Sequence, residues 1–252
     1  MTGLSEKVAI VTGAGNGIGF RFAERLAAAG TRVALVDRDR AAAEIAATRI
    51  SEAGGAAIAL RADISNERET EEVVKNTLEQ FGSLDILINN AALYANIALK
   101  PIEEVPLEEW DRVMAVNLRG LFLMTRAVVP HMKAERSGKI VNMSSNTVFS
   151  GAPQMLHYVT SKAGVIGFTR SLAKELGLFG ICVNAITPGL TDTAASESTI
   201  PSDRFDVVIG ARALKRRQTP DDLLGALLFL VSPESDFITG QVLNVDGGQI
   251  LH

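Results

Sequence analysis

Residues 7–19 carry the strongest structural signal in this chain, because the apolar run Lys7-Val8-Ala9-Ile10-Val11-Thr12 leads directly into Gly13-Ala14-Gly15-Asn16-Gly17-Ile18-Gly19. The apolar run predicts a buried strand. A glycine-rich turn between a strand and a helix lets backbone N–H groups approach a pyrophosphate. A helix is predicted over residues 17–29 with Gly30 as its C-cap, since Phe22 and Leu26 lie on one stripe.

A second apolar run, residues 32–37, ends in the carboxylate of Asp37, which lies 18 residues after Gly19. At about this spacing, dinucleotide-binding folds place an acid that accepts hydrogen bonds from the adenosine ribose. Such an acid repels a 2′-phosphate, so Asp37 favours NAD over NADP. Arg38 keeps NADP open as an alternative, because its guanidinium could turn toward a phosphate. The alternative to a cofactor site is that the glycines only form a turn and that Asp37 only ends a strand.

Further apolar strands alternate with helical segments, at residues 57–60, 84–88, 139–143, 182–186 and 242–245. This alternation predicts an α/β fold: a Rossmann-type, doubly wound parallel sheet with helices on both faces. No linker or charge block divides the chain, so one domain over residues 1–252 is expected. Polar residues such as Asp63 and Asn89 follow the strands, and ligands of open parallel sheets lie beyond those carboxyl ends.

Tyr158 and Lys162 are four residues apart, and Ser145 stands 13 positions before the tyrosine. On a helix, positions i and i+4 share a face, and a nearby cation favours the anionic form of a phenol. We therefore expect Lys162 to lower the pKa of Tyr158, making the phenol usable for proton transfer near neutral pH. Taken alone, the spacing also fits two residues on a helix surface.

Over essentially its whole length the chain resembles the short-chain dehydrogenase/reductase family. The matching segments, in order, are Thr12-Gly13 with Gly17 and Gly19, Asp63-Ile64, Asn89-Asn90-Ala91, Asn117, Ser145, Tyr158 with Lys162, and Pro188-Gly189. The chain departs from the family pattern at Ala92, where the family usually has glycine. A methyl group at that crowded turn predicts a small backbone adjustment near the cofactor.

The resemblance implies a role for each matching residue. Tyr158 would exchange the alcohol proton, Ser145 would hydrogen-bond the substrate oxygen, and Asn117 would anchor a water chain leading to Lys162. These four residues form the expected catalytic set. The residues expected to contact NAD are Gly13, Asn16, Gly17, Ile18, Gly19, Asp37, Asp63, Ile64, Asn90, Tyr158, Lys162, Pro188, Gly189, Thr191 and Thr193. Alternatively, Asn117 could be a hydrogen-bonded polar residue inside a helix, and Ser145 could be a serine in the turn after a strand.

The substrate is expected to be a hydrophobic secondary alcohol or its ketone, including aromatic ones. The candidate contacts besides Ser145 are Tyr94, Phe149, Leu156, His157 and Phe205, which could equally be core residues. Residues 194–212 are expected to form a lid. Segments around Tyr94 and Ser145 resemble the 1-phenylethanol dehydrogenase and pyridoxal 4-dehydrogenase branches. A 3-oxoacyl-carrier-protein reductase and a non-catalytic NAD-binding regulator are the alternatives.

Composition excludes several other classes. A net charge of −4 gives no footprint for nucleic acid, and the only basic run is Lys215-Arg216-Arg217. No metal is expected, because His131, His157 and His252 lack ligand spacing. Neither a signal segment nor a membrane span is evident, and the single cysteine suits a reducing cytoplasm, the expected location. By family resemblance, the helix at residues 157–176 would pack against a symmetry mate in a homotetramer.

Overall fold

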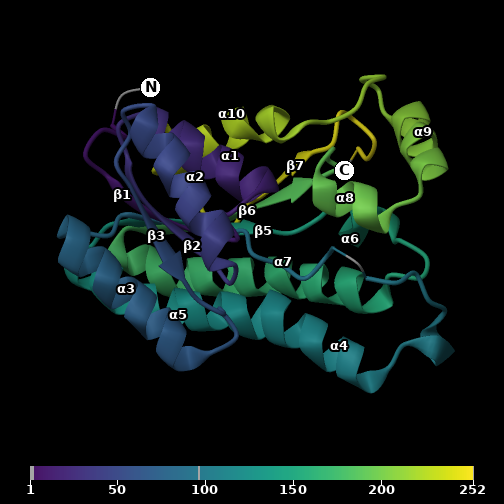
Figure 1. Cartoon of the computed structure of the whole chain (residues 1–252), viewed down its shortest axis with the longest axis horizontal. Coiled ribbons are helices and arrows are strands. Elements are labelled where there is room, and N and C mark those ends of the chain that lie inside the picture. Colours follow the sequence, from purple (N-terminus) through teal and green to yellow (C-terminus); the bar gives the residue numbers. More distant parts are fainter. Residues whose placement is uncertain (1–2, 96, 252) are drawn as a thin grey trace.

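A single parallel sheet organises the molecule (Figure 1). The computed structural model describes residues 3–95 and 97–251. Within them, seven strands pair in the order β3-β2-β1-β4-β5-β6-β7, and every pairing is parallel. The strands are β1 (Val8–Thr12), β2 (Arg32–Asp37), β3 (Ala57–Arg61), β4 (Ile86–Asn89), β5 (Gly138–Met143), β6 (Ile181–Pro188) and β7 (Val242–Val245).

Helices cover both faces of this sheet. They are α1 (Gly17–Ala28), α2 (Arg40–Glu52), α3 (Glu67–Phe81), α4 (Leu107–Met114), α5 (Leu121–Glu135), α6 (Thr147–Ser150), α7 (Leu156–Leu176), α8 (Ala194–Thr199), α9 (Ser202–Ala211) and α10 (Leu224–Val231). In Figure 1, α1, α2 and α10 lie above the sheet, while α3, α5 and α7 lie below it.

Alternate residues of β1 feed the two halves of the core. Ala9 and Val11 belong to the cluster that packs under α1, α2 and α10. Val8 and Ile10 belong to the cluster that packs against α3, α5 and α7. Side chains alternate across a strand, so a strand buried on both faces must be apolar throughout. The uniform apolar run in the sequence is therefore explained, and the predicted doubly wound fold is confirmed.

The strand order reverses between β1 and β4, because β1 pairs with both β2 and β4. Chain segments leave these neighbouring strands in opposite directions across the sheet, which opens a crevice at their carboxyl ends. The segments that follow β1, β2, β4, β5 and β6 all reach this edge. The fold therefore brings together residues that lie more than 150 positions apart in the sequence.

The helix that carries Asn117 is continuous but changes its hydrogen-bonding pattern around that residue. Between α4 and α5, residues Ala115–Gly120 form a π-helical turn with Asn117 inside it. By length and composition alone, the helical run Leu107–Glu135 is long and apolar enough to cross a membrane, which corrects the expectation that the sequence has no such stretch. Half of the most apolar stretch of this run is buried inside the protein. Met124, Val128 and Met132 pack into the half of the core that contacts α3, α5 and α7. This packing is that of a core helix.

The segment predicted as a weakly periodic lid is helical over most of its length. It contains α8 and α9, joined by Ile200 and Pro201. Thr193 caps α8, since its side chain accepts a hydrogen bond from the Ser196 N–H while Ser196 Oγ accepts one from the Thr193 N–H. This reciprocal arrangement fixes the entry into α8. Within the described residues, β6, α8 and α9 thus form a continuous ordered path beside the crevice.

Candidate active site

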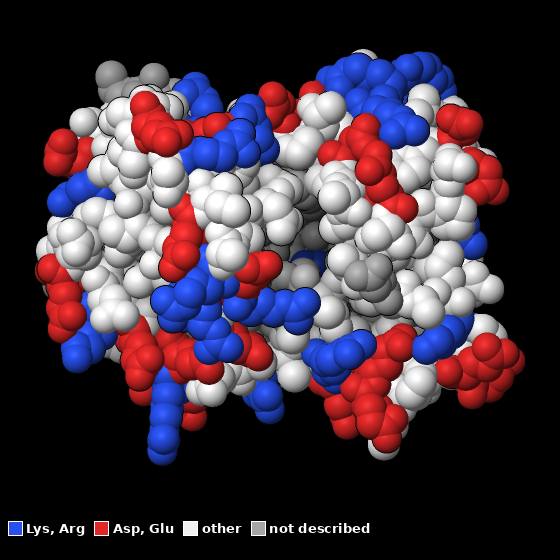
Figure 2. Space-filling model, viewed as in Figure 1, with Lys and Arg blue, Asp and Glu red and all other residues white. Residues whose placement is uncertain are grey.

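A cavity of about 530 Å³ lies at the carboxyl edge of the sheet. It extends from the glycine turn after β1, past the ends of β4 and β5, to α8 and α9. Figure 2 shows the molecule hollowed near the centre of the viewed face. A cavity of this size, lined by apolar groups and a few polar ones, is suited to small molecules.

The glycine turn shapes one end of the cavity. Gly13 and Gly17 have φ of +63° and +55°, which L side chains rarely adopt. Gly19 is buried, and a Cβ there would overlap the Gly13 carbonyl oxygen. The chain can therefore make this sharp turn at the N-terminus of α1 only with glycine at these positions. The N–H groups at that terminus, together with the helix dipole, suit a pyrophosphate.

Asp37, at the end of β2, stands beside this turn. Its Oδ2 accepts a hydrogen bond from the Gly15 N–H at 3.0 Å, and its Oδ1 accepts one from the Asp39 N–H at 3.0 Å. Asp37 lines the cavity, with Arg38 next to it. The carboxylate is thus fixed beside the glycine turn, at the cavity wall.

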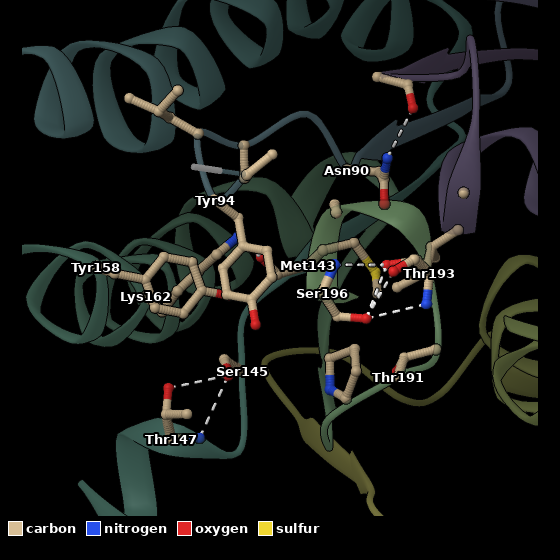
Figure 3. A pocket seen from close by; sticks show the side chains of 18 of the residues that line it. Asn90, Tyr94, Met143, Ser145, Thr147, Tyr158, Lys162, Thr191, Thr193 and Ser196 are labelled. Atoms are coloured by element: carbon tan, nitrogen blue, oxygen red, sulfur yellow. Dashed lines mark hydrogen bonds between the residues drawn. The ribbon is translucent and has the colours of Figure 1, made fainter. Parts of the chain in front are cut away.

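Asn90 and Asp63 line the cavity at the same end as the glycine turn. The Asn90 side-chain amide donates to the backbone oxygens of Thr12 and Gly13 at 3.0 and 3.1 Å, which joins the β4 end to the glycine turn (Figure 3). For Asp63, burial acts to raise the pKa, but hydrogen bonds from Ser65 and the charges of Arg38 and Arg61 outweigh it and lower the pKa. The carboxylate is therefore ionised beside the cavity.

Ser145, Tyr158 and Lys162 meet at the other end (Figure 3). Ser145 follows β5, whereas Tyr158 and Lys162 lie one turn apart on α7. The Ser145 hydroxyl accepts hydrogen bonds from the Thr147 N–H at 3.3 Å and from the Thr147 hydroxyl at 2.9 Å. The Lys162 ammonium donates to the Met143 carbonyl oxygen at 2.8 Å.

The electrostatics of the phenol differ from the prediction. Burial raises the pKa of Tyr158, and the neighbouring Tyr94 raises it further, while the nearby Ser145 hydroxyl acts in the opposite direction. Burial also lowers the pKa of the Lys162 ammonium to about 8. This ammonium lies 5.8 Å from the Tyr158 ring centroid and is directed to the Met143 carbonyl. The expected lowering of the phenol pKa by Lys162 is therefore absent, because desolvation dominates.

Asn117 is positioned behind this group. It is 2% exposed, and its Nδ2 donates to Ser161 Oγ at 3.0 Å. Its Oδ1 accepts a hydrogen bond from the Leu93 N–H at 2.7 Å. Asn117 therefore joins the π-helical turn to α7 and to the segment carrying Tyr94. All four expected catalytic residues are gathered at this end of the molecule, and three of them line the cavity.

The remaining expected cofactor residues also line the cavity: Gly13, Asn16, Gly17, Ile18, Gly19, Ile64, Pro188, Gly189, Thr191 and Thr193. The Pro188 carbonyl oxygen accepts a hydrogen bond from the Asn146 N–H at 3.0 Å, which keeps the β6 end against the segment after Ser145. Thr191 is held by its own hydroxyl, which donates to the Gly189 carbonyl at 3.0 Å. Ala92 lines the cavity as well, so its methyl group is accommodated.

The predicted substrate contacts divide into two groups. Tyr94 lines the cavity, and its ring centroid lies 5.1 Å from that of Tyr158 (Figure 3). Burial raises the pKa of Tyr94 to about 12, so its hydroxyl keeps its proton at neutral pH.

The second group lies outside the cavity wall, which corrects the prediction for Phe149, Leu156, His157 and Phe205. His157 is fully buried, and its Nε2 hydrogen-bonds Glu109 Oε1 at 3.0 Å. Phe205 is buried under the Arg217 guanidinium. Phe149 and Leu156 are 38% and 41% exposed.

Other residues occupy the wall instead. Sequence reasoning missed Met143, Thr147, Ala152, Pro153, Met155, Ile200, Arg204, Val208 and Gln249. Met143 could have been found as the last residue of a strand. Arg204 and Val208 share a face of α9 by their i, i+4 spacing, but the helix itself was not predicted.

Comparisons with known proteins agree with this geometry. Residues 13–249 match the family model described as enoyl-(acyl carrier protein) reductase. A 3-oxoacyl-[acyl-carrier-protein] reductase of Synechocystis sp. is 38% identical, with all of both chains covered. The galactitol 2-dehydrogenase of Agrobacterium fabrum is 40% identical over 97% of this chain and 98% of its own.

A solved structure gives the same result in three dimensions. The crystal structure of 3-ketoacyl-(acyl-carrier-protein) reductase from Brucella melitensis complexed with NADH has a TM-score of 0.91 and 38% identity, covering 99% of this chain and 100% of that one. The expected four residues, the glycine turn and the whole-length matches lead to one conclusion. The chain belongs to the short-chain dehydrogenase/reductase family of oxidoreductases.

Proposed function

We propose that this protein is an NAD-dependent dehydrogenase that interconverts a hydrophobic secondary alcohol, preferably an aryl one, and its ketone. The observation that carries the proposal is the pair of phenols, Tyr158 and Tyr94, that stand beside Ser145 in a mostly apolar cavity. Ser145 would hydrogen-bond the substrate oxygen, Tyr158 would exchange its proton, and Tyr94 would provide an aromatic wall.

The proton step follows from the electrostatics of the site. A raised pKa keeps Tyr158 protonated at neutral pH, which suits proton donation to a ketone. When bound, NAD would accept the hydride and NADH would donate it. The nicotinamide ring of the oxidised form would place a positive charge beside the phenol. For alcohol oxidation, Lys162 can stabilise the phenolate while it stays charged, which holds below about pH 8.

Asp37 supports NAD over NADP. Its carboxylate is fixed by the Gly15 N–H and would repel a 2′-phosphate. Exchanging the charge without changing the shape tests this: Asp37→Asn should raise kcat/KM for NADP relative to NAD by about tenfold or more, equivalent to about 1.4 kcal/mol. Asp39→Asn is the matched control, because Asp39 is also an acid in this segment but caps α2 outside the cavity wall. Equal cofactor ratios in both variants would refute the role of Asp37.

The second candidate function is 3-oxoacyl-carrier-protein reduction. It is favoured by the Synechocystis and Brucella melitensis reductases, each 38% identical over nearly the whole chain. Asp37 and the net charge of −4 argue against NADPH and an acidic carrier. A non-catalytic regulator is the third alternative, and the presence of all four catalytic residue types argues against it.

One kinetic panel separates these functions. Initial rates would be measured with NAD, NADP and their reduced forms on 1-phenylethanol, acetophenone, an alicyclic alcohol, galactitol and acetoacetyl-CoA. Among the neutral substrates of the panel, the proposal predicts the highest kcat/KM for the aryl pair with NAD(H). Preference for acetoacetyl-CoA with NADPH would establish the carrier-protein alternative, and tight NAD binding with no turnover would establish the regulator.

Three further hypotheses belong to the same proposal. Helices α8 and α9 would act as the lid, closing over the substrate and excluding water. The chain would work in the cytoplasm as a homotetramer in which α7 and the helix carrying Asn117 pack against symmetry mates. Light scattering tests the assembly, since a species of 26.8 kDa at micromolar concentration would contradict it.

A further inference from the structure

Helix α9 presents one cation to the substrate end of the cavity. Arg204 and Val208 are one turn apart on this helix, and both line the wall together with Ile200 just before it. The other residues of the wall between Ser150 and Met155 are apolar or neutral and include Ala152, Pro153 and Met155. A lone guanidinium in such surroundings needs a chemical reason.

The guanidinium of Arg204 is not neutralised within the described part of the chain. Its hydrogen bond is to the neutral amide oxygen of Gln154, at 3.4 Å, near the long limit for such bonds. No ion pair involves it among the described residues. Asp203 and Asp206 are neighbours in the sequence, but positions i−1 and i+2 do not face the same side of a helix.

The other basic residues of this region are engaged. Arg216 forms a two-pronged pair with Asp222, and Arg217 pairs with Asp192. Arg212 donates to the carbonyl oxygens of Leu190 and Arg216. Arg204 therefore differs from Arg216 and Arg217, which have carboxylate partners, and it differs from Arg212 because its side chain borders the cavity.

Gln154 holds this arrangement in place. It adopts φ of +69°, a strained value for a residue with a side chain, and its carbonyl oxygen accepts a hydrogen bond from the Lys100 N–H at 3.1 Å. This fixes the residue whose side-chain oxygen faces the guanidinium. Gln154 can thus orient Arg204 without cancelling its charge.

Charge along the cavity is distributed unevenly. The acids that line it, Asp37 and Asp63, lie at the end proposed for the adenosine. Among the described lining residues after Ser145, none is acidic. An anionic group on the substrate would therefore meet Arg204 and no opposing carboxylate.

We infer that the substrate carries an anionic oxygen group, a carboxylate or a phosphate, remote from its reacting carbon, and that Arg204 binds it. The inference rests on the proposed oxidoreductase function and adds a chemical class to its substrate. A charge-assisted hydrogen bond contributes about 1.5–3 kcal/mol, so loss of Arg204 should weaken binding of the anion about 10- to 100-fold. Arg204 would determine specificity without taking part in proton transfer.

Two matched substrate pairs test the inference and identify the source of the anion. The first is 3-benzoylpropanoate and its methyl ester, which differ by a carboxylate charge. The second is acetoacetyl-4′-phosphopantetheine and acetoacetyl-pantetheine, which differ by one phosphate. Wild type, Arg204→Gln, Arg204→Lys and the control Arg68→Gln would be compared, since Arg68 lies on α3 away from the cavity. NAD affinity and thermal melting would check the fold of each variant.

The expected result is a KM about 10- to 100-fold higher for the anionic member of one pair in Arg204→Gln, with kcat nearly unchanged. The neutral member should be unaffected, Arg204→Lys should recover part of the loss, and Arg68→Gln should match wild type. The pair that responds identifies carboxylate or phosphate. If the anionic-to-neutral preference is the same in wild type and Arg204→Gln for both pairs, the inference is overturned while the enzyme stays active. If wild type reduces neither ketone nor thioester, the proposed function has failed and this inference with it.

Discussion

Gly19→Ala should damage the cofactor turn more than any other single methyl addition in α1. A Cβ at this position would overlap the backbone oxygen of Gly13 and come within 2.5 Å of Asn90 Nδ2. Neither group can move easily, because the Asn90 amide is bonded to the Thr12 and Gly13 oxygens. Overpacking a rigid site costs about 1–3 kcal/mol, and clashes with backbone lie at the upper end.

We therefore expect Gly19→Ala to lower the free energy of unfolding by about 3 kcal/mol. For a chain of this length, the melting temperature should fall by roughly 6–12 °C at fixed protein concentration. The dissociation constant for NAD should rise at least about tenfold, because the N–H groups of the turn must shift. Differential scanning calorimetry and fluorescence titration measure the two effects.

Gly225→Ala is the matched control. Gly225 is an exposed helical glycine of α10, and a Cβ there would meet no atom within 4 Å. Alanine is better than glycine in a helix by about 0.5–1 kcal/mol, so this variant should be neutral or slightly more stable. If Gly19→Ala melts with the control and binds NAD like wild type, the account of the turn as sterically closed is refuted.

Two other substitutions probe buried charge. Lys162→Met should abolish activity. It should nevertheless raise the free energy of unfolding at pH 7 by on the order of 2 kcal/mol, because it removes a buried charge. The cost of burying that charge is seen in the pKa of Lys162, which burial lowers from 10.5 to about 8. Between about pH 8 and 10.5 the unfolded chain holds a proton on Lys162 that the folded chain has lost, so the stability of the wild type rises with pH in this range. The stability advantage of Lys162→Met over wild type should therefore shrink as the pH rises. Urea denaturation at pH 7 and 9.5 measures this, and a gain independent of pH would contradict it. Glu109→Ala should destabilise by about 1–3 kcal/mol, since it leaves buried His157 Nε2 unpaired, whereas Glu108→Ala should stay within about 0.5 kcal/mol of wild type in the same assay.

The parts of the site that sequence predicted well depend on local backbone geometry. The turn at Gly13–Gly19 and the carboxylate of Asp37 each follow directly from a strand, so the direction of the chain determines where they lie. Tyr158 and Lys162 are one helical turn apart, and that spacing alone aligns them. The order of strands in the sheet then brings the two groups to one edge, as the alternation of elements indicated.

The errors have a common geometric cause. His157 adjoins Tyr158 in the sequence and Phe205 lies within the expected lid, but successive helical residues point about 100° apart. His157 therefore faces Glu109, and Phe205 faces Arg217, while Arg204 faces the cavity. Sequence adjacency is a poor guide to the wall of a site formed by helices.

The predicted lowering of the Tyr158 pKa was wrong for a different reason. The spacing of Lys162 indicated proximity, but the balance between a charge at that distance and full burial depends on tertiary packing. The ammonium is directed to the Met143 carbonyl by the β5 end, which no local pattern encodes. Electrostatic magnitudes in the site thus required the assembled fold.

The central claim is that the Tyr158 hydroxyl exchanges the substrate proton while Ser145 holds the substrate oxygen. The most direct test is the single-turnover rate of Tyr158→Phe with 1-phenylethanol and NAD, at matched NAD saturation and with folding checked by circular dichroism. We expect the rate to fall at least about 100-fold, the lower range for loss of a general acid or base, with NAD affinity nearly unchanged. A correctly folded variant that turns over at the wild-type rate would contradict the account.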